Sequence, residues 1–416
     1  MTVAQERIAT NGRADAAIRD VLARTADLAD RLAEGAAALD HEGARPVEAL
    51  RQVAESGLLA APLAVAHGGA GMGTDLGRTA PLLLLLKGLG RGNLAIGRIY
   101  EGHVNALMLI EQFGTREQAA MYAAAARDER RLFGVWNTEA QDGVHVVPAG
   151  LGRFRLEGSK TFASGAGLVD RPLVTGALPD GRWQMCVVPM ECVRVAIDPS
   201  WWRPIGMHAS ASYRVDFGGV ELGPDDLLGA PGDYYQDPWF RGGAIRFAAV
   251  QLGGAEALLD AACTELRAAG RDADPYQRAR IGEAAIAVEG GALWLRAAAE
   301  VADRYLAEPG PHPSAPDAAE SVVAYANMTR LAVERACLEV MQLVERSVGA
   351  RGLLRPHPIE RIVRDLTLYL RQPAPDAALA DIGRYAFASP PPTASLWKRD
   401  ERSAQRASEM GEGGDE

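Results

Sequence analysis

The chain has 416 residues, of which 48% are hydrophobic and 24% are charged, a balance typical of globular proteins. Its formal net charge of -10 argues against a dedicated nucleic-acid binder. Apolar stretches such as residues 82–86 are far shorter than the roughly 20 residues of a membrane span. Residues 1–15 lack the apolar core of a signal peptide. We therefore expect a cytoplasmic protein with neither a nucleic-acid nor a membrane partner.

The first third of the chain has helical periodicity. We expect a disordered N-terminus over residues 1–12 and a helical domain over residues 13–130. A helix is predicted from about Asn93 to Phe113. Gly114 ends it, and Thr115 with Gln118 forms a capping-box pattern that starts the next helix.

Strand patterns replace helical ones in the middle of the chain. Residues 131–238 contain few helix signals and are predicted to form a separate β domain, either a barrel or a sandwich. The predicted strands include residues 153–156, 184–189, 193–197 and 213–217.

Helical periodicity returns in residues 239–388, which we predict to form a four-helix bundle. The predicted helices are residues 241–270, 276–306, 317–349 and 358–370, with a short fifth helix over 376–387. Residues 389–416 are rich in proline, glycine and mixed charge, and we expect a disordered tail there. The fold class is therefore mainly α with a central β domain.

The cysteines and histidines give no sign of a metal site. Cys186, Cys192, Cys263 and Cys337 match no zinc spacing, and the seven histidines form no HExxH pair. We expect four buried thiols in a reducing compartment. No glycine-rich phosphate loop follows a strand, which disfavours a Rossmann domain.

Several segments, taken in order, resemble the acyl-CoA dehydrogenase superfamily over residues 13–387. The segments are "LAVAHGGAG" at 63–71, "QFGTREQ" at 112–118, "WNTEAQDG" at 136–143, "LEGSKTFASGAG" at 156–167, "PIGMHASASYRVDFGGVELGPDDLLG" at 204–229 and "GARGLLRPHPIERIVRDL" at 349–366.

The resemblance implies a flavin bound between the β domain and the bundle. FAD is the usual cofactor of the family, and FMN is possible if the protein is a monooxygenase. Thr138, Phe162 and Ser164 match the residues that face, cover and hydrogen-bond the flavin ring. A flavin needs an aromatic wall and donors at its polar edge. Singly, each residue also fits a plain role as a strand, core or turn residue.

Three more positions match the family's contacts to the rest of the cofactor. Arg271 corresponds to an arginine that reaches a diphosphate across a dimer interface, although it could equally be a solvated charge at a helix end. Gly349 and Gly352 correspond to glycines that let the backbone approach the cofactor. Family members are homodimers or homotetramers, and we expect the same here.

The general base of an acyl-CoA dehydrogenase is missing. Its usual glutamate position falls on Pro373, and the position used by a minority of the family falls on Ile245. Neither side chain can accept a proton. Asp376 is the nearest acidic candidate, and it also suits a helix cap.

Other features resemble the flavin-dependent monooxygenase branch of the superfamily. The segment "KTFASGA" at 160–166 is nearer to that branch, and "EGHVNAL" at 101–107 resembles its helix with a histidine at the site of oxygen activation. His103 is thus a candidate catalytic residue, with a core histidine bonded to a backbone carbonyl as the structural alternative. His208 stands where the family has arginine and is a candidate substrate contact.

We therefore expect a flavin-dependent oxidoreductase, first as an enzyme that removes the α and β hydrogens of an acyl-CoA or similar thioester. One alternative is a two-component monooxygenase that uses reduced flavin and oxygen. Another is an inactive flavin- or acyl-binding paralogue. The expected partners are a small-molecule substrate and either an electron-transfer flavoprotein or a flavin reductase.

Overall fold

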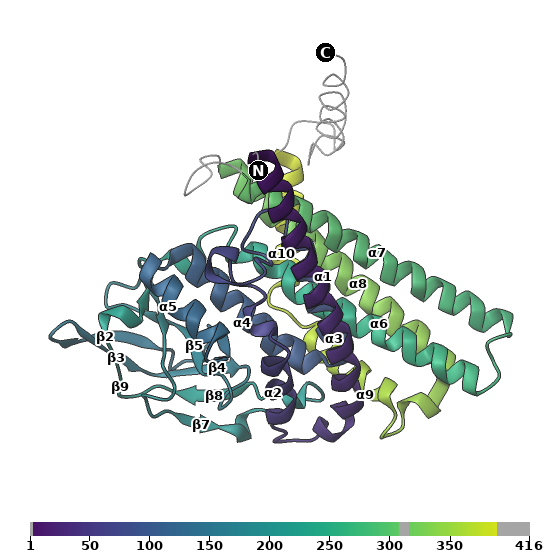
Figure 1. Ribbon diagram of the computed structural model, residues 1–416. Helices are drawn as coiled ribbons and strands as arrows, with labels where there is room; N and C mark the ends of the chain where they lie inside the picture. The colour runs from purple at the N-terminus through teal and green to yellow at the C-terminus, as the bar shows by residue number, and fades with distance from the viewer. Residues whose placement is uncertain (1–2, 308–315, 389–416) are drawn as a thin grey trace, which may run out of the picture.

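The computed structural model describes residues 3–307 and 316–388 and arranges them in three successive regions (Figure 1). The first region is helical, the middle region holds the described strands, and the last region is helical again. This is the predicted mainly α fold with a central β domain. The tail predicted to be disordered, residues 389–416, lies outside the described residues.

The N-terminal region consists of five helices and short 3-10 turns. Helix α1 already begins at Val3, within the segment 1–12 for which we expected disorder, because those residues continue the helix whose later turns bury Val21 and Leu28. The bounds are α1 Val3–Gly35, η1 Ala36–Leu39, α2 Val47–Glu55, η2 Leu58–Ala60, η3 Val65–His67, α3 Thr79–Gly92, α4 Leu94–Phe113 and α5 Arg116–Arg127.

Side chains cap α4 and α5 as the sequence suggests. The Asn93 side chain accepts hydrogen bonds from the amides of Ala95 and Ile96 at the start of α4. Thr115 and Gln118 form the reciprocal capping box that opens α5. The predicted break between the two helices is thereby confirmed.

The middle region forms two sheets, so the barrel alternative is wrong for the described strands. A seven-stranded sheet has the order β10-β6-β5-β2-β3-β9, with β1 paired in parallel to β5, and a three-stranded sheet has the order β4-β8-β7. The bounds are β1 Phe133–Trp136, β2 His145–Gly150, β3 Arg153–Glu157, β4 Ser159–Ala163, β5 Arg171–Ala177, β6 Trp183–Val187, β7 Ala196–Asp198, β8 Tyr213–Asp216, β9 Val220–Leu222 and β10 Leu227–Leu228.

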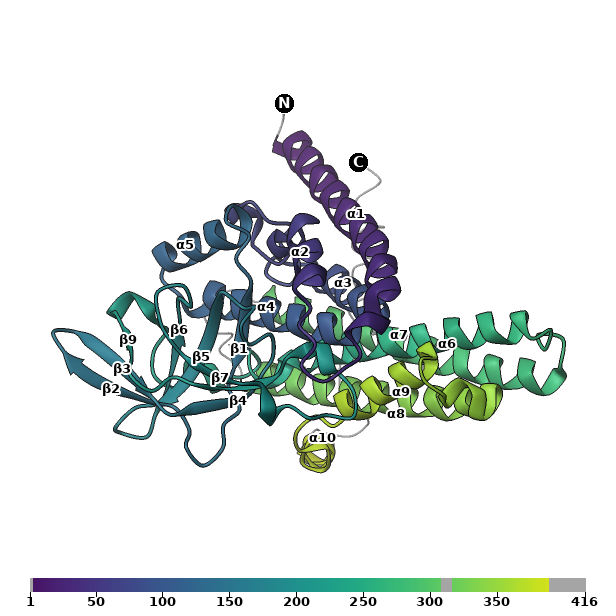
Figure 2. The same ribbon diagram turned by 90° about the horizontal axis from the view of Figure 1, so that it is seen from below.

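The C-terminal helices end within three residues of their predicted bounds. They are α6 Ala244–Ala268, α7 Pro275–Leu306, α8 Pro316–Val348, α9 Pro358–Tyr369 and α10 Pro375–Ala388. Helices α6, α7 and α8 are long and run side by side, whereas α9 has 12 residues and packs on α6 (Figures 1 and 2).

Helix α4 joins the three regions. Both views show it between the strands and α6, and it contacts β1, α6 and α9 (Figures 1 and 2). Fourteen of its 20 residues are buried, because sheet and bundle cover opposite sides of it. One large hydrophobic cluster extends from α1 through the sheets into α8, so the three regions share a core.

Helices α3 and α6 cross closely at glycines. A methyl group on Gly253 of α6 would lie 2.1 Å from the carbonyl oxygen of Lys87, and one on Gly90 of α3 would lie 2.1 Å from that of Val250. The two backbones therefore need hydrogen at both positions.

The four thiols have different exposures. Cys186 and Cys337 are buried, but Cys263 is partly exposed and Cys192 is exposed, so the expectation of four buried thiols is correct for only two. Across residues 3–307 and 316–388, no group of three or more potential ligand side chains is placed to hold a metal ion. None of the described helices has the length and apolar character needed to span a membrane.

Candidate functional site

A bulge in β4 turns Phe162 toward the surface. The pairing of β4 with β8 shifts register between Lys160 and Ala163, as expected of a β-bulge. Phe162 lies in this bulge with φ +52°, in the left-handed region that side chains rarely adopt. As a result, 49% of this aromatic residue is exposed.

Two tryptophans hold the Phe162 ring. The centroids of Trp201 and Trp202 lie 4.8 and 5.8 Å from it, with both rings near-perpendicular to Phe162. Both follow β7, in and just after the 3-10 turn η4 (Pro199–Trp201). The sequence prediction missed them, although a Trp-Trp pair beside a proline is a visible signal.

Thr138 and Ser164 both lie next to β4. Thr138 is exposed just after β1, and its carbonyl accepts the amide of Thr161, which ties β1 to β4 at 2.8 Å. Ser164 is buried, and its hydroxyl contacts Ser212 at 2.9 Å, which in turn contacts Ser210 at 2.8 Å. The structure thus brings Thr138, Phe162 and Ser164 together beside a chain of three hydroxyls.

A buried lysine fixes the end of β1. Lys160 has no exposed surface, and its Nζ donates to the carbonyl of Asn137 at 2.9 Å, to Glu139 at 2.6 Å and to Thr175 at 3.2 Å. Burial lowers the pKa of Lys160, and the Glu139 carboxylate opposes part of that effect. The buried Lys160 and its partner Glu139 therefore fix the loop that carries Asn137 and Thr138.

His103 is a fully buried residue of α4 with both ring nitrogens engaged. Nε2 lies 2.8 Å from the carbonyl of Leu59, and Nδ1 accepts the amide of Phe133 at 3.1 Å. An amide can only donate, so Nδ1 is unprotonated and the proton is on Nε2. Burial lowers the pKa to about 4. This geometry is that of the core histidine named as the structural alternative, and no ring nitrogen is left for a reacting group.

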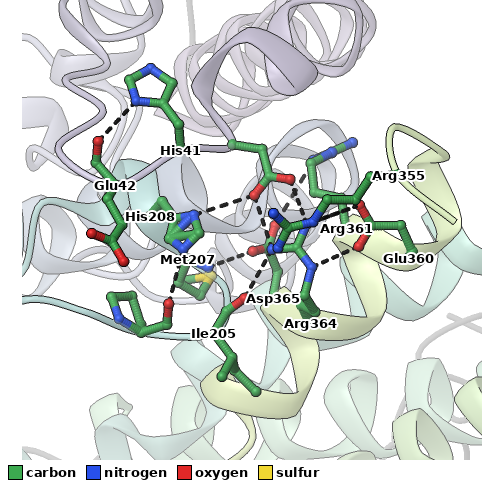
Figure 3. Close-up of polar contacts among 12 residues, drawn as sticks. His41, Glu42, Ile205, Met207, His208, Arg355, Glu360, Arg361, Arg364 and Asp365 are labelled. Atoms are coloured by element: carbon green, nitrogen blue, oxygen red, sulfur yellow. Dashed lines mark hydrogen bonds and ion pairs between the residues drawn. The ribbon is translucent and has the colours of Figure 1, made fainter. Parts of the chain in front are cut away.

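His208 lies in an interdomain network and not on an open face. It is buried in the 3-10 turn η5 (His208–Ser210), with Nε2 2.9 Å from the Pro204 carbonyl and Nδ1 3.4 Å from Asp40. Burial lowers the pKa of its imidazole, although Asp40 opposes the effect. Figure 3 shows His208 beside Met207, close to Arg364 and Asp365 of α9.

Arg364 joins all three regions in this network. Its guanidinium donates to Asp40 after η1, to the carbonyl of Ile205 at 2.9 Å and to Glu360 at 2.7 Å (Figure 3). Asp365 accepts the amide of Met207, and burial raises the pKa of this aspartate to about 6. The arrangement fixes α9 against the loop before β8.

Asp376 and the second group of predicted cofactor residues lie elsewhere. Asp376 is exposed in the first turn of α10, where a negative charge suits the helix N-terminus. Arg271 is exposed in the α6–α7 turn, 3.4 Å from the carbonyl of Ser347 at the end of α8. Figures 1 and 2 place this turn at the end of the bundle away from the sheets. Arg271 therefore does not meet Phe162 within one chain.

The two glycines have local structural roles at that same end. Gly349 follows α8 with φ +66°, the left-handed conformation that commonly ends a helix. Gly352 is buried in η9 (Gly349–Leu353), and a methyl group there would lie 2.2 Å from Val348. Both positions therefore need glycine for the turn itself.

The sequence prediction missed a partly buried polar cluster on α4. Arg98 and Asn105 both donate to the carboxylate of Glu101, and the Nε of Arg246 in α6 donates to Asn105. Helical spacing of three and four residues puts the first three on one face of α4. The spacing of these three residues could have been read from the sequence. It could not show that α6 supplies a second arginine to the cluster.

Comparison with known proteins gives the family. The model of the acyl-CoA dehydrogenase N-terminal domain matches residues 14–128, and that of the C-terminal domain matches residues 245–370. Together these matches cover more than half of the chain, which belongs to the acyl-CoA dehydrogenase superfamily.

Several of the similar proteins are named as monooxygenases. The dibenzothiophene monooxygenase of Rhodococcus erythropolis is 26% identical over 93% of this chain and 97% of its own. The structure of TdsC from Paenibacillus sp. A11-2 with FMN and indole has a TM-score of 0.79 at 22% identity, and covers 91% of this chain and 99% of that one. The methanesulfinate monooxygenase MsuC of Pseudomonas fluorescens has a TM-score of 0.78 at 20% identity, with the same coverage.

Proposed function

We propose that this oxidoreductase is a two-component monooxygenase, which takes reduced flavin from a partner reductase and transfers one atom of molecular oxygen to a small organic substrate. The main support is that neither of the two positions where an acyl-CoA dehydrogenase has its general base holds a residue that can accept a proton here. Ile245 is buried and apolar, and Pro373 has no side-chain acceptor. The relatives favour this alternative over the thioester dehydrogenation that we expected first.

The neighbouring carboxylates do not replace the missing base. Glu101 is held by Arg98 and Asn105, and Glu139 is held by Lys160. Both carboxylates are already occupied by hydrogen bonds from cationic or amide side chains of the protein. Removal of an α-proton from a thioester is therefore disfavoured at this face of the described chain.

The residues around β4 fit a flavin ring. A flat tricyclic ring needs an aromatic surface and donors at one edge. Phe162 offers a half-exposed ring fixed by two tryptophans, and Thr138 and Ser164 are the hydroxyl residues next to its strand. When bound in its reduced form, the flavin supplies the electrons that activate oxygen. We favour FMN, because TdsC is described with FMN, and retain FAD as the alternative.

Within this site the chain's own residues bind, orient and exclude water. Phe162 covers the ring, and the Ser164–Ser212–Ser210 hydroxyls hold protons close to its edge. Lys160 and Asn137 fix the β1 loop, so Thr138 keeps its position when the cofactor binds. Arg271 lies at the far end of the bundle, so we propose that a second copy of the chain completes the cofactor site.

An oxygen-isotope experiment tests the proposal. Purified protein is given FMN reduced by a separate reductase, ¹⁸O₂ and either dibenzothiophene or indole. We expect one ¹⁸O atom in the product by mass spectrometry. In a parallel anaerobic titration, butyryl-CoA should fail to bleach protein-bound oxidised FMN. Bleaching would instead identify a dehydrogenase, and flavin binding without either reaction would identify an inactive paralogue.

A further inference from the structure

A cavity of about 190 Å³ lies among α1, α3, α6 and α9, where α3 ends and α4 begins. All of its lining residues belong to these helices or to the junction of α3 and α4, and none of them is a residue that we propose to hold the flavin. The volume is several times the roughly 30 Å³ that one water occupies in the liquid, and it is below the roughly 300–1,000 Å³ of pockets for drug-sized ligands. The cavity therefore suits a small molecule.

A guanidinium on the wall of this cavity has no hydrogen-bond acceptor. Only 12% of the Arg361 side chain is exposed. Its Nη1 lies 3.9 Å from Oδ2 of Asp365, which is too long for a hydrogen bond (Figure 3). Among the described residues, no other group accepts a hydrogen bond from this side chain. Arg361 stays charged at neutral pH, so its N–H groups need an acceptor that the described chain does not supply.

Asn93 adds a second donor without a partner. The residue is 5% exposed and lines the cavity between α3 and α4. Its Oδ1 accepts the amides of Ala95 and Ile96 as the cap of α4, so Nδ2 is turned away from that helix. Within residues 3–307 and 316–388, no acceptor contacts Nδ2. The cavity is thus lined by two sets of unmet donors.

Asp365 supplies an acceptor beside these donors. Its Oδ1 accepts the amide of Met207, whereas its Oδ2 faces Arg361 across the 3.9 Å gap. Burial raises the pKa of Asp365 to about 6, so the carboxylate is ionised at pH 7.5. A ligand that carries both an acceptor and a donor can therefore bond to Arg361 and to Asp365 at once.

Three ionised side chains frame the cavity on its solvent side. Arg91 donates to Asp30 at 3.2 Å and to Asp260 at 3.0 Å, and both carboxylates are mostly exposed. With Arg361 and Asp365 included, the walls carry three carboxylates and two guanidiniums. A simple anion would meet net repulsion there, and a simple cation would leave the Arg361 donors unmet. The wall charges therefore favour a ligand with both signs of charge.

We propose that the cavity binds a small zwitterion, namely an α-amino acid with an apolar side chain. The ligand carboxylate accepts hydrogen bonds from Arg361 and Asn93, and the ligand ammonium donates to Asp365. A planar guanidinium suits a carboxylate, and the charges of ligand and wall are complementary. The ligand side chain lies against the apolar part of the wall, which is formed by Ala33, Leu94, Ala257, Ala261 and Ile362. This inference does not depend on the proposed function.

Three matched probes test the charge pattern on the full-length protein at pH 7.5, by saturation-transfer NMR titration. L-Valine carries both charges, 3-methylbutanoate lacks the ammonium, and isobutylamine lacks the carboxylate. We expect L-valine to bind at least roughly 10-fold more tightly than either single-charge probe. Equal or tighter binding of a single-charge probe would overturn the proposal. Absence of binding by all three would also overturn it, since the cavity would then hold only water.

Asp365→Asn separates the two charges of the ligand. Asparagine keeps an oxygen for the Met207 amide but loses the negative charge. L-Valine should therefore bind roughly 10-fold more weakly, whereas 3-methylbutanoate should bind more tightly because a repulsive charge is gone. A general disturbance of the cavity would change both affinities in the same direction, and that result would contradict the assigned role of Asp365.

Two further variants test the carboxylate contacts. Arg361→Gln should weaken L-valine roughly 10- to 100-fold, and Arg361→Lys should recover part of the loss. Asn93→Ser keeps a side-chain cap on α4 but removes the Nδ2 donor, so the melting temperature should hardly change while L-valine binds roughly 5-fold more weakly. Arg384→Gln, in the exposed ion pair with Glu320, is the control and should leave the affinity unchanged. If Arg361→Gln does not fold, unaltered L-valine affinity in Asn93→Ser refutes the proposed contacts by itself.

Discussion

The Nη1 atom of Arg364 lies 3.0 Å from the carboxylate of Asp40, although the two residues are 324 positions apart in the chain. Burial alone would raise the pKa of Asp40, but the hydrogen bonds and charge of Arg364 lower it overall. The same guanidinium bonds Glu360 and the Ile205 carbonyl, so one side chain links the first helical region, the β domain and the bundle. These contacts hold the three regions of the chain together.

We predict that Arg364→Met destabilises the protein by roughly 3 kcal/mol or more, because Asp40 and Glu360 then lose their shortest ion pairs in a largely buried network. Arg384→Met is the matched control. Its ion pair with Glu320 is largely exposed and should contribute at most about 1 kcal/mol. Urea unfolding of both variants measures the difference, and equal losses would contradict the buried role of Arg364.

The buried imidazole of His103 makes stability depend on pH. Above pH 6.5 the ring is neutral in both the folded and the unfolded chain. Between pH 6.5 and about 4 the unfolded chain binds a proton that the folded ring does not, so the free energy of unfolding falls as the pH falls. The contribution of this residue is about 3 kcal/mol over that interval.

His103→Gln tests that slope. Glutamine does not titrate and its amide can still donate to Leu59, so the variant should lose most of the decline between pH 6.5 and 4. Urea unfolding at half-unit pH steps measures it. An identical slope in wild type and variant would show that His103 is not the group responsible.

The crossing of α3 and α6 should be intolerant of a methyl group. Gly253→Ala brings a Cβ to 2.1 Å from the backbone oxygen of Lys87, and backbone cannot rotate away, so we expect destabilisation by roughly 1–3 kcal/mol. Gly282→Ala in α7 has no neighbour within 4 Å and should stabilise by about 0.5–1 kcal/mol through helix propensity. The melting temperature should therefore fall in Gly253→Ala and rise in Gly282→Ala. If both variants shift it in the same direction, the assigned close crossing of α3 and α6 is wrong.

Phe162 should affect flavin binding and not stability. Phe162→Ala removes a half-exposed ring, so the melting temperature should hardly change, while the dissociation constant for reduced FMN should rise up to roughly 10-fold. Phe387→Ala, at an exposed position of α10, is the control and should leave FMN affinity unchanged. Fluorescence titration measures both. Unaltered FMN affinity in Phe162→Ala would place the ring of the cofactor elsewhere.

The sequence by itself determined the order of the three regions and the bounds of the C-terminal helices to within three residues, because these depend on contacts between residues near in the chain. Helical periodicity, the Thr115–Gln118 capping box and the glycine after α4 fix their helix ends locally. The segment of β4 with Phe162 and Ser164 was also visible, since strand alternation and a family motif coincide there.

Only the tertiary structure decided what the candidate residues do. It buried His103 between two backbone partners, placed Arg271 in the α6–α7 turn beside the end of α8, and joined Arg246 to a cluster on α4. Sequence spacing cannot supply such contacts, because burial, hydrogen-bond partners and net local charge depend on elements hundreds of residues apart that meet only when the three regions pack.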